Sequence, residues 1–250
     1  LAQMSSTSIK SWLIRVPFLY ETVQGFRDVK FHKAGMQSRS FSQHGEDVKL
    51  LSLLREAQAT GPYLDIGCNH PFRLSNTYLL YLNGWRGLCV DPLPRFKAGY
   101  KRFRPNDTFQ CVAVGEEEGE LPLFEFESDV LTTLDPQLAE AYRAGGHRLL
   151  RQSKVSVRTI NSVLESHRLS PPLSLLSLDI EGHELSALRS INLDYWRPEF
   201  VCMEVLTADG QKNDAAIEYL HRNGYRLAGD LGLNMVFRRA AQPAANEDAH

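Results

Sequence analysis

Excess charge of one sign and long apolar runs are both missing from this 250-residue sequence. Thirty acidic side chains nearly balance 28 basic ones, which gives a formal net charge of −2. Because binding to a nucleic-acid backbone depends on clustered lysine and arginine, this balance argues against duplex nucleic acid as the main partner. No apolar stretch approaches the about 18–20 residues that a membrane-spanning helix needs, so we expect no transmembrane segment.

Cysteine is scarce, and no CxxC pair is present among the four cysteines. Cys89, Cys111 and Cys202 lie inside apolar runs, which is typical of small buried side chains in a reducing compartment. Disulfides or a thiolate metal site are the less favoured alternatives. Residues 1–8 lack a signal-peptide pattern, so we expect a soluble, cytoplasmic protein.

A glycine-rich dinucleotide fingerprint is also lacking. The apolar run at residues 63–67 ends at Gly67, which allows the backbone to approach a ligand closely. Asn69 and Pro71 then stand where a GxGxxG motif would need glycine, and this weakens the case for a bound pyrophosphate. The turn alone does not identify a cofactor, and an ordinary tight turn remains the alternative.

Apolar runs alternate with helical patterns along most of the chain. Continuous apolar runs of this kind indicate parallel strands that are buried on both faces. They lie at residues 63–67, 87–91, 108–114, 173–179 and 200–205. The runs at 225–230 and 233–238 are too close for a crossover and must be antiparallel neighbours. We predict an α/β, Rossmann-like fold: a mostly parallel sheet with a C-terminal antiparallel strand and helices on both faces.

One main domain is expected over residues 41–239. Residues 1–40 form an N-terminal extension, in which we predict a helix over 9–30 and a linker over 32–42. The helix is expected to pack on the domain or cover its active site, with membrane-surface binding as the alternative. Its apolar stripe, which includes Trp12, is a candidate surface for homo-oligomer formation. Residues 115–160 interrupt the alternation as an insertion, and residues 240–250 are predicted to be disordered.

Acidic residues end four of the apolar runs, and these are Asp65, Asp91, Asp179 and Glu204. In an open parallel sheet, ligands bind beyond the carboxyl ends of the strands. Asp65 can accept a hydrogen bond from a cationic amine or order its loop. Asp91 follows Gly67 by 24 residues and can accept the ribose hydroxyls of an adenosyl group, with a helix-capping role as the alternative.

Residues 179–184 hold the densest group of titratable side chains. Asp179 is expected to project into the crevice, and His183 could take a proton from a hydroxyl because its ordinary pKa is near neutrality. A structural role at the helix start is the alternative for His183. We take Asp179, Glu181 and His183 as candidate catalytic residues. Asp179 and Glu204 end neighbouring strands and could together hold a divalent cation, although hydrogen-bonded carboxylates explain them equally well.

The polar segment at residues 42–47, SQHGED, precedes a predicted helix. Ser42 could be the helix N-cap, with a glutamate later in the first turn. The same segment could instead reach over a bound cofactor. Position in the sequence leaves both interpretations open.

Taken together and in order, these motifs resemble the FkbM family of methyltransferases over about residues 40–238. The segment with the most specific match is LDIEGHE at 178–184. The other matching segments are SQHGED at 42–47, LDIG at 64–67, SNT at 75–77, GWRG at 84–87, VDP at 90–92, AVG at 113–115 and MEV at 203–205.

The resemblance implies a seven-stranded Rossmann-like fold, S-adenosylmethionine as methyl donor, and O-methylation of hydroxyls on sugars or polyketide-type natural products. It places the methionine end of the cofactor near Asp65, Gly67 and Asn69, the ribose at Asp91 and the adenine near Ala113 and Val114. Three further residues in matching positions, Gln43, Asn76 and Pro92, are expected to contact the cofactor. The family often has alanine or a second glycine after the first motif's glycine. Here CNHP at 68–71 follows instead, which leaves the path of the loop open.

Two other functions remain as alternatives. A nicotinamide-dependent oxidoreductase is disfavoured by the missing glycines. A non-catalytic interaction module on a methyltransferase-like scaffold is disfavoured because all the acidic residues at strand ends are present. The expected partner is a small-molecule hydroxyl acceptor, whose site we expect the insertion at 115–160 and the N-terminal helix to shape.

Overall fold

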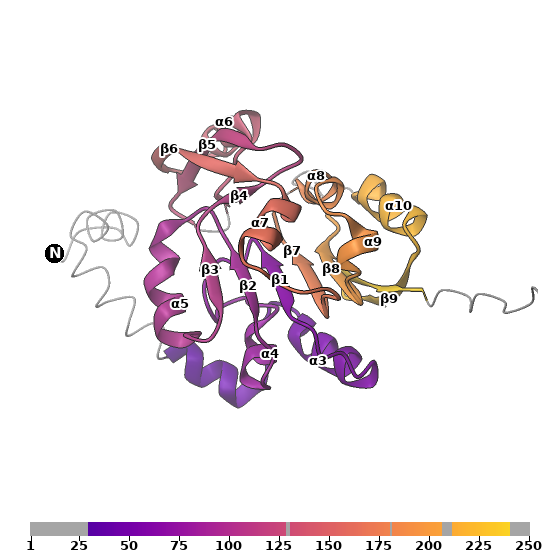
Figure 1. The fold of residues 1–250 in the computed structure, drawn as a ribbon. Coiled ribbons are helices and arrows are strands. Elements are labelled where there is room, and N and C mark those ends of the chain that lie inside the picture. The colour runs from indigo at the N-terminus through magenta and orange to yellow at the C-terminus, as the bar shows by residue number, and fades with distance from the viewer. Residues whose placement is uncertain (1–29, 129–130, 181, 207–211, 241–250) are drawn as a thin grey trace, which may run out of the picture.

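The computed structural model of the chain describes residues 30–128, 131–180, 182–206 and 212–240 (Figure 1). The N-terminal stripe around Trp12, the catalytic candidate Glu181 and almost all of the C-terminal tail therefore lie outside the described residues. Within the N-terminal extension, residues 30–38 are helical, so the linker predicted over 32–42 is wrong for most of its length.

A seven-stranded sheet forms the centre of the fold, in the order β3-β2-β1-β7-β8-β10-β9. The strands are β1 (Tyr63–Ile66), β2 (Gly87–Val90), β3 (Thr108–Gln110), β7 (Leu175–Leu178), β8 (Phe200–Glu204), β9 (Tyr225–Asp230) and β10 (Asn234–Arg239). In this sheet β10 pairs antiparallel with β8 and β9, while the pairings among β3, β2, β1, β7 and β8 are parallel. The predicted mostly parallel sheet with a C-terminal antiparallel strand is confirmed.

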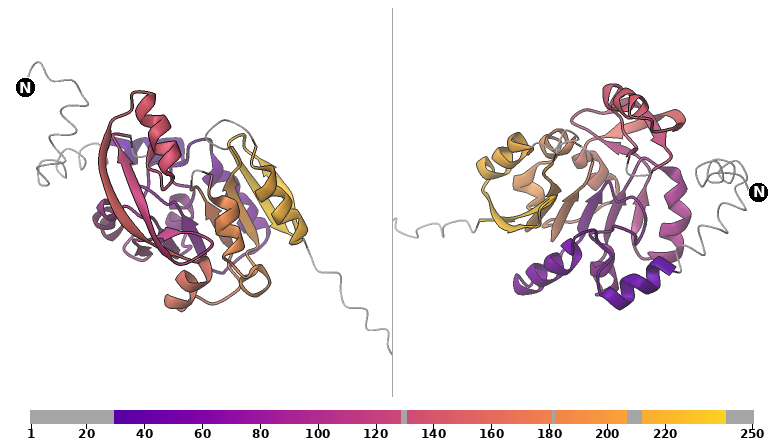
Figure 2. Two further views of the ribbon diagram at one scale, coloured as in Figure 1. Left: turned by 90° about the horizontal axis from the view of Figure 1, so that it is seen from above. Right: turned by 180° about the vertical axis from the view of Figure 1, so that it is seen from behind.

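Helices cover both faces of this sheet (Figure 2). Strand residues alternate between two apolar cores, because successive side chains of a strand point to opposite faces. In β2, Leu88 and Val90 join one core and Cys89 joins the other. The first core packs against α7 (Ile160–Ser166), α8 (Glu184–Arg189), α9 (Leu193–Trp196) and α10 (Asp214–Arg222). The second packs against α3 (Glu46–Glu56), α4 (Tyr78–Leu82), the 3₁₀ turn η1 (Pro94–Phe96) and α5 (Lys97–Phe103).

A smaller sheet stands apart from the main one, at the top of Figure 1. It consists of β4 (Ala113–Val114), β6 (Leu149–Arg158) and β5 (Gly119–Phe126), in that order, with α6 (Pro136–Ala144) beside it. The single strand predicted over 108–114 is therefore wrong, because β3 and β4 belong to different sheets. Strand β6 is ten residues long, because it pairs with all of β5. Residues 151–154 in the middle of the strand are polar and mostly exposed, so they give no apolar signal.

Three of the cysteines, Cys68, Cys89 and Cys202, are buried and free, as small core side chains would be. Cys111 is also free but exposed, because it lies in the segment that leaves β3 rather than inside a strand. None of the helices in the described part combines the length and apolar character that a bilayer-spanning helix requires.

A buried ion pair connects the elements on the α3–α5 face. The guanidinium of Arg104, just after α5, donates from Nε to Oδ2 of Asp107 at 2.7 Å, and both side chains are 0% exposed. Its Nη2 donates to the Tyr63 hydroxyl of β1 at 2.8 Å and to Thr77 Oγ1 at 2.9 Å. Thr77 in turn donates to Asp65 at 2.5 Å. One cation thus ties β1 to the segments before α4 and after α5.

We predict that Arg104→Met lowers the free energy of unfolding by about 3–5 kcal/mol, because it leaves Asp107 as an uncompensated buried charge. Urea denaturation measures the change. Arg143→Met on α6 is the control, since Arg143 and its partner Glu140 are 57% and 71% exposed and such a pair contributes about 0–1 kcal/mol. Equal, small effects of the two substitutions would contradict a structural role for the buried pair.

Candidate functional site

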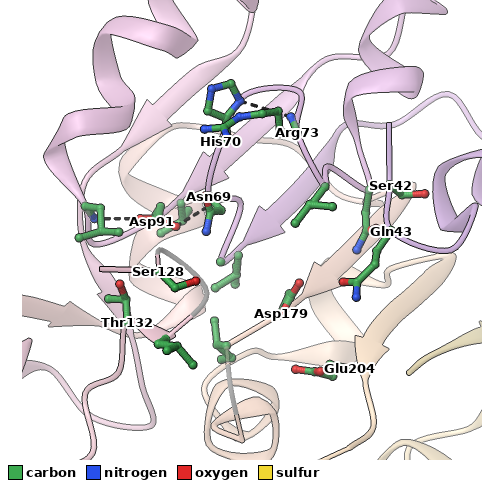
Figure 3. Close-up of a pocket in the computed structure, with 18 of the residues that line it drawn as sticks. Ser42, Gln43, Asn69, His70, Arg73, Asp91, Ser128, Thr132, Asp179 and Glu204 are labelled. Carbon is green, nitrogen blue, oxygen red and sulfur yellow. Dashed lines mark hydrogen bonds between the residues drawn. The ribbon is translucent and has the colours of Figure 1, made fainter. Parts of the chain in front are cut away.

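One large cavity opens at the carboxyl ends of the parallel strands, with a volume of about 1320 Å³ (Figure 3). Ligand sites for one small molecule usually have about 300–1,000 Å³. The volume of this cavity therefore exceeds what one nucleoside-sized ligand requires. The strand ends contribute Ile66, Gly67, Val90, Asp91, Asp179 and Glu204.

Nearly all of the residues predicted from the sequence meet in this cavity. Those that line it are Gln43, Gly67, Asn69, Asn76, Asp91, Pro92, Ala113, Val114, Asp179, His183 and Glu204. Asp65 is the exception among the described residues. Its side chain lies on the α4 side of β1, where Thr77 donates to it, and burial raises the pKa of its carboxyl. The interpretation of Asp65 as a residue that orders its surroundings fits this position, whereas a place in the cavity lining does not.

Gly67 lies where two functional turns touch. Its φ of +75° is in the left-handed region, and a Cβ there would overlap the backbone carbonyl oxygen of Asp179. Its amide donates to Val90 O at 2.9 Å, while the Asp179 amide donates to Ile66 O at 3.0 Å. The turn after β1 and the turn after β7 are therefore packed backbone against backbone, and only glycine fits between them.

The loop after Gly67 takes its path through Asn69 and Asp91. Asn69 adopts a positive φ of +46°, a conformation that asparagine tolerates better than most residues. Its amide donates to Oδ2 of Asp91 at 2.9 Å, and the Leu93 amide donates to Oδ1 at 2.8 Å. Burial nevertheless raises the pKa of Asp91 to about 6, against the lowering effect of these two amides. Asp91 is thus a buried carboxyl held in a fixed orientation at the cavity edge.

The polar segment at residues 42–47 is not the N-cap that Ser42 suggested. Helix α3 begins at Glu46 after Gly45, and no side chain caps it. Instead the Asp47 carboxylate accepts from the hydroxyl of Ser42 at 2.8 Å and the amide of Phe41 at 2.7 Å. Ser42, Gln43 and Glu46 line the cavity, so the segment reaches over it, which was the second interpretation.

Glu46 and Asn234 connect this segment to β10. Asn234 Nδ2 donates to Oε1 of Glu46 at 2.9 Å, and the His44 amide donates to Oε2 at 2.8 Å. Burial raises the pKa of Glu46, but these hydrogen bonds outweigh it and the pKa is lowered overall. Glu46 is therefore a buried, ionised carboxylate beside the cavity.

The loop after β7 is shaped by Glu184. Its Oε1 accepts from the amides of Ile180 and Gly182, each at 3.2 Å, and its Oε2 accepts from Asn213 at 3.3 Å. This buried carboxylate has the structural role expected of an acid at a helix start. His183 is half-buried, lies at the N-cap position of α8 and lines the cavity.

Asp179 and Glu204 end adjacent strands, as expected, because β7 pairs with β8 through Leu178 and Met203. Both side chains reach the cavity, near Gln43 in Figure 3. In the described part of the chain, no group of three or more His, Cys, Asp or Glu side chains is arranged to hold a metal ion. A cation bound between Asp179 and Glu204, as predicted, would therefore have at most these two carboxylates as ligands from the described residues.

Two parts of the cavity lining were not predicted residue by residue. One is the helix at 30–38, which contributes Phe31, Ala34, Gly35 and Ser38. The other we name the β5–α6 wall, and it consists of Leu123, Glu127, Ser128, Leu131, Thr132, Thr133, Leu134 and Tyr142. The wall belongs to the predicted insertion, but its residues share no motif. Only the interruption of the strand–helix alternation could have indicated them.

His70 and Arg73 also line the cavity without having been predicted. Nδ1 of His70 accepts from the amides of Phe72 at 3.4 Å and Arg73 at 3.3 Å, so a neutral ring carries its proton on Nε2. The Arg73 guanidinium lies 5.5 Å from the centroid of the Phe31 ring. These residues follow the Gly67 turn directly, and only their closeness to it in the sequence could have indicated them.

We predict that Gly67→Ala destabilises the protein by more than Gly224→Ala does. At both positions alanine must adopt a positive φ, which costs about 1–2 kcal/mol. At Gly67 the new methyl group must also displace the Asp179 carbonyl, whereas nothing lies within 4 Å of a Cβ at Gly224. Chemical denaturation of the two variants gives the comparison. Similar losses would mean that the two turns are not held against each other.

Comparison with known proteins gives one match to a family model. Residues 65–227 match the model of the methyltransferase FkbM domain, which is more than half of the chain and spans the sheet from β1 to β9. No curated protein sequence matches the chain.

Solved methyltransferase structures show a weak likeness. A TehB-like SAM-dependent methyltransferase from Corynebacterium glutamicum has 14% identity and a TM-score of 0.43, with 88% of this chain and 100% of that chain covered. A methyltransferase from Geobacter sulfurreducens has 6% identity and a TM-score of 0.43, with 87% and 95% covered.

A third likeness is to 1,6-didemethyltoxoflavin-N1-methyltransferase from Burkholderia thailandensis, solved with bound 1,6-didemethyltoxoflavin and S-adenosylhomocysteine. It has 12% identity and a TM-score of 0.40, with 95% of this chain and 92% of that chain covered. With TM-scores below 0.5, these likenesses add nothing to the fold, which rests on the strand order.

The family match and the cavity concern the same residues. The matched region holds the Gly67 turn, Asp91, Ala113 and Val114 and the segment that begins at Asp179, all of which the fold brings to one cavity. The strand order, with one antiparallel strand inserted before the last, agrees with the fold that the motifs implied. The chain therefore belongs to the FkbM methyltransferase domain family.

Proposed function

We propose that this protein is an S-adenosylmethionine-dependent O-methyltransferase that acts on a hydroxyl of an uncharged sugar or natural-product-type small molecule. The observation that carries the proposal is the single cavity that joins the Gly67 turn and Asp91 on one side to Asp179 and His183 on the other. Its volume supports a cofactor and an acceptor bound together.

The residues at the Gly67 turn fit the cofactor. A glycine that no Cβ can replace allows close approach of the methionine part, and the fixed Asp91 carboxylate has lone pairs left for the ribose hydroxyls. Pro92, Ala113 and Val114 supply an apolar border for the adenine. Gln43 and Asn76 complete the polar lining at the methionine end in this proposal.

When bound, the cofactor supplies a methyl group on a positively charged sulfur, which is already activated for displacement. The protein's work is to align the acceptor oxygen with that methyl group and to remove the hydroxyl proton. In our proposal Asp179 orients the acceptor hydroxyl. Either Asp179 or the imidazole of His183 accepts the hydroxyl proton. Asp179 is suited to this because its backbone is fixed against Gly67.

The charge of the lining supports an uncharged acceptor. Apart from Asp91, the cavity is lined by the carboxylates of Glu46, Glu127, Asp179 and Glu204, whereas the described lining has one arginine, Arg73, and no lysine. Like charges that approach in a partly desolvated cavity repel each other strongly. A phosphorylated acceptor would therefore bind poorly at the Asp179 side, and hydroxyl-rich neutral molecules are favoured.

We predict that S-adenosylhomocysteine and S-adenosylmethionine each raise the melting temperature and that NAD does not. A ligand at 100 times its Kd adds about 2.7 kcal/mol to the stability. For a domain of this size that corresponds to a shift of roughly 5–10 °C. Absence of a shift with both adenosyl ligands would overturn the proposed function in favour of the interaction module, and a shift with NAD alone would favour the oxidoreductase.

We predict that Asp179→Asn and His183→Ala lower methyl transfer without weakening the binding of S-adenosylhomocysteine by more than a few-fold. Loss of a general base typically costs about 10²–10⁴-fold in rate. Transfer of a tritium-labelled methyl group to paired sugars with and without a phosphate measures this and the expected preference for the uncharged member. Glu165→Gln, which alters an exposed carboxylate of α7, is the control. Full turnover in both site variants would reject these roles.

We predict that affinity for S-adenosylhomocysteine falls as the pH drops through about 6. Asp91, whose pKa is raised to about 6, must be ionised to accept the ribose hydroxyls, so Kd should rise roughly tenfold between pH 7.5 and 5. The raised pKa also means that the folded chain holds this proton more tightly than the unfolded chain. This group's contribution to stability therefore decreases as the pH rises from about 4 to 6.

Calorimetric titration from pH 5 to 8 measures the pH dependence of binding. Asp91→Asn provides the control, since any pH dependence that remains in this variant belongs to groups other than Asp91. A wild-type profile identical to that of Asp91→Asn would exclude Asp91 as the ribose-binding acid.

A further inference from the structure

A mostly buried ion pair joins the loop after Asp91 to the β5–α6 wall. Arg95 lies in η1, and its Nη1 lies 2.8 Å from Oε2 of Glu125 in β5. The two side chains are 24% and 10% exposed, so the pair is screened little by solvent. A charge-assisted hydrogen bond of this length is stronger than a neutral one. The contact crosses from the main sheet's side of the cavity to the smaller sheet.

At the wall, Glu125 stands between two residues that position the lining. Phe124 exchanges two backbone hydrogen bonds with Thr133, at 2.9 and 3.2 Å. Phe126 packs edge-on against Tyr142, with ring centroids 5.5 Å apart. Thr133 and Tyr142 both line the cavity, so a displacement of Glu125 would displace both of them.

At the other end, Arg95 is part of the turn that fixes Asp91. The Leu93 amide donates to the Asp91 carboxylate, and the Phe96 amide donates to Leu93 O at 3.3 Å, which closes the turn around Arg95. The Arg95 guanidinium lies 5.4 Å from the centroid of the Phe96 ring. Its positive charge also favours the ionised form of Asp91.

We propose that Arg95 is a positioning residue that couples the two halves of the cavity, because one guanidinium supports the Asp91 carboxylate and holds the β5–α6 wall through Glu125. This inference rests on the proposed function, in which Asp91 binds the ribose and the wall contacts the acceptor. Ribose binding at Asp91 then tightens the turn that carries Arg95, and the ion pair transmits the change to β5.

Several groups besides Arg95 act on the charge of Asp91 and must be considered in a pH measurement. Asp65 from β1 disfavours its ionisation. The thiols of Cys68, in the turn after β1, and Cys111, after β3, interact electrostatically with Asp91, and Lys97 acts on Cys111. Substitutions in the ion pair leave all of these groups in place, so they isolate the contribution of Arg95.

The test uses the full chain with four substitutions: Arg95→Gln, Glu125→Gln, Arg95→Lys and the control Arg151→Gln. Arg151 approaches the other oxygen of Glu125 at 3.9 Å but is 67% exposed. Hydrogen exchange of residues 119–128 is followed with and without S-adenosylhomocysteine. In the wild type and in Arg151→Gln, the ligand should slow this exchange by about fivefold or more, the lower end of typical coupling between sites. Both glutamine variants of the pair should lose that protection while still binding the ligand.

A pH profile of ligand binding separates positioning from general loosening of the fold. In Arg95→Gln the midpoint should move to higher pH, because Asp91 loses a favourable cation. In Glu125→Gln it should stay or move to lower pH, because Arg95 keeps its charge and loses a competing carboxylate. Arg95→Lys should keep the wild-type midpoint. A structural disturbance would move the midpoints of the two glutamine variants in the same direction.

Retained protection of residues 119–128 in both glutamine variants would overturn the coupling and leave the proposed function intact. Parallel shifts of the two midpoints would also overturn it. If the wild type bound no S-adenosylhomocysteine at all, the proposed function would fail, and this inference with it.

Discussion

The buried pair of Arg104 and Asp107 is the interaction on which the Gly67 side of the cavity depends. It links β1 through Tyr63 to the segment before α4 through Thr77. Arg104 Nη1 also donates to Pro71 O at 3.3 Å, at the end of the loop that follows Gly67. Two ionised groups buried together must satisfy each other's charge, so the fold has little freedom to move any segment that contributes to the network. The loop after the Gly67 turn is thus held at its far end by the same network.

The rigidity of this network matters because the turn after β1 and the turn after β7 share one backbone contact. Gly67 lies against the Asp179 carbonyl, so in the proposed function one packing contact sets both the turn beside the methyl donor and the turn that carries Asp179. Catalysis of group transfer depends on alignment within fractions of an ångström. Because neither turn can shift alone, the two turns keep their alignment with each other.

The sequence was sufficient for most of the main sheet and for the cavity residues at its strand ends, since both follow from short-range signals. Continuous apolar runs located the strands of the main sheet, and acids at their ends located Asp91, Asp179 and Glu204. Asp65 shows the limit of this reasoning, because its position at a strand end does not reveal which face it occupies. The pairing of β6 with β5 depends on contacts between distant residues, and Ser42 was a plausible cap until Asp47 proved to hold it. Arg104 carries no motif at all, and only its burial identifies it.

The cavity is built on two separate sheets, and this division has an evolutionary consequence. Residues that suit the adenosyl group come mostly from the ends of the main sheet, while the β5–α6 wall hangs on the smaller one. Changes in β5, α6 or the loop between them can alter the shape offered to an acceptor without touching the strands under the cofactor. Under the proposed function, descendants of such a chain could change their acceptors by altering the smaller sheet and α6 alone, as long as the ion pair of Arg95 and Glu125 is kept.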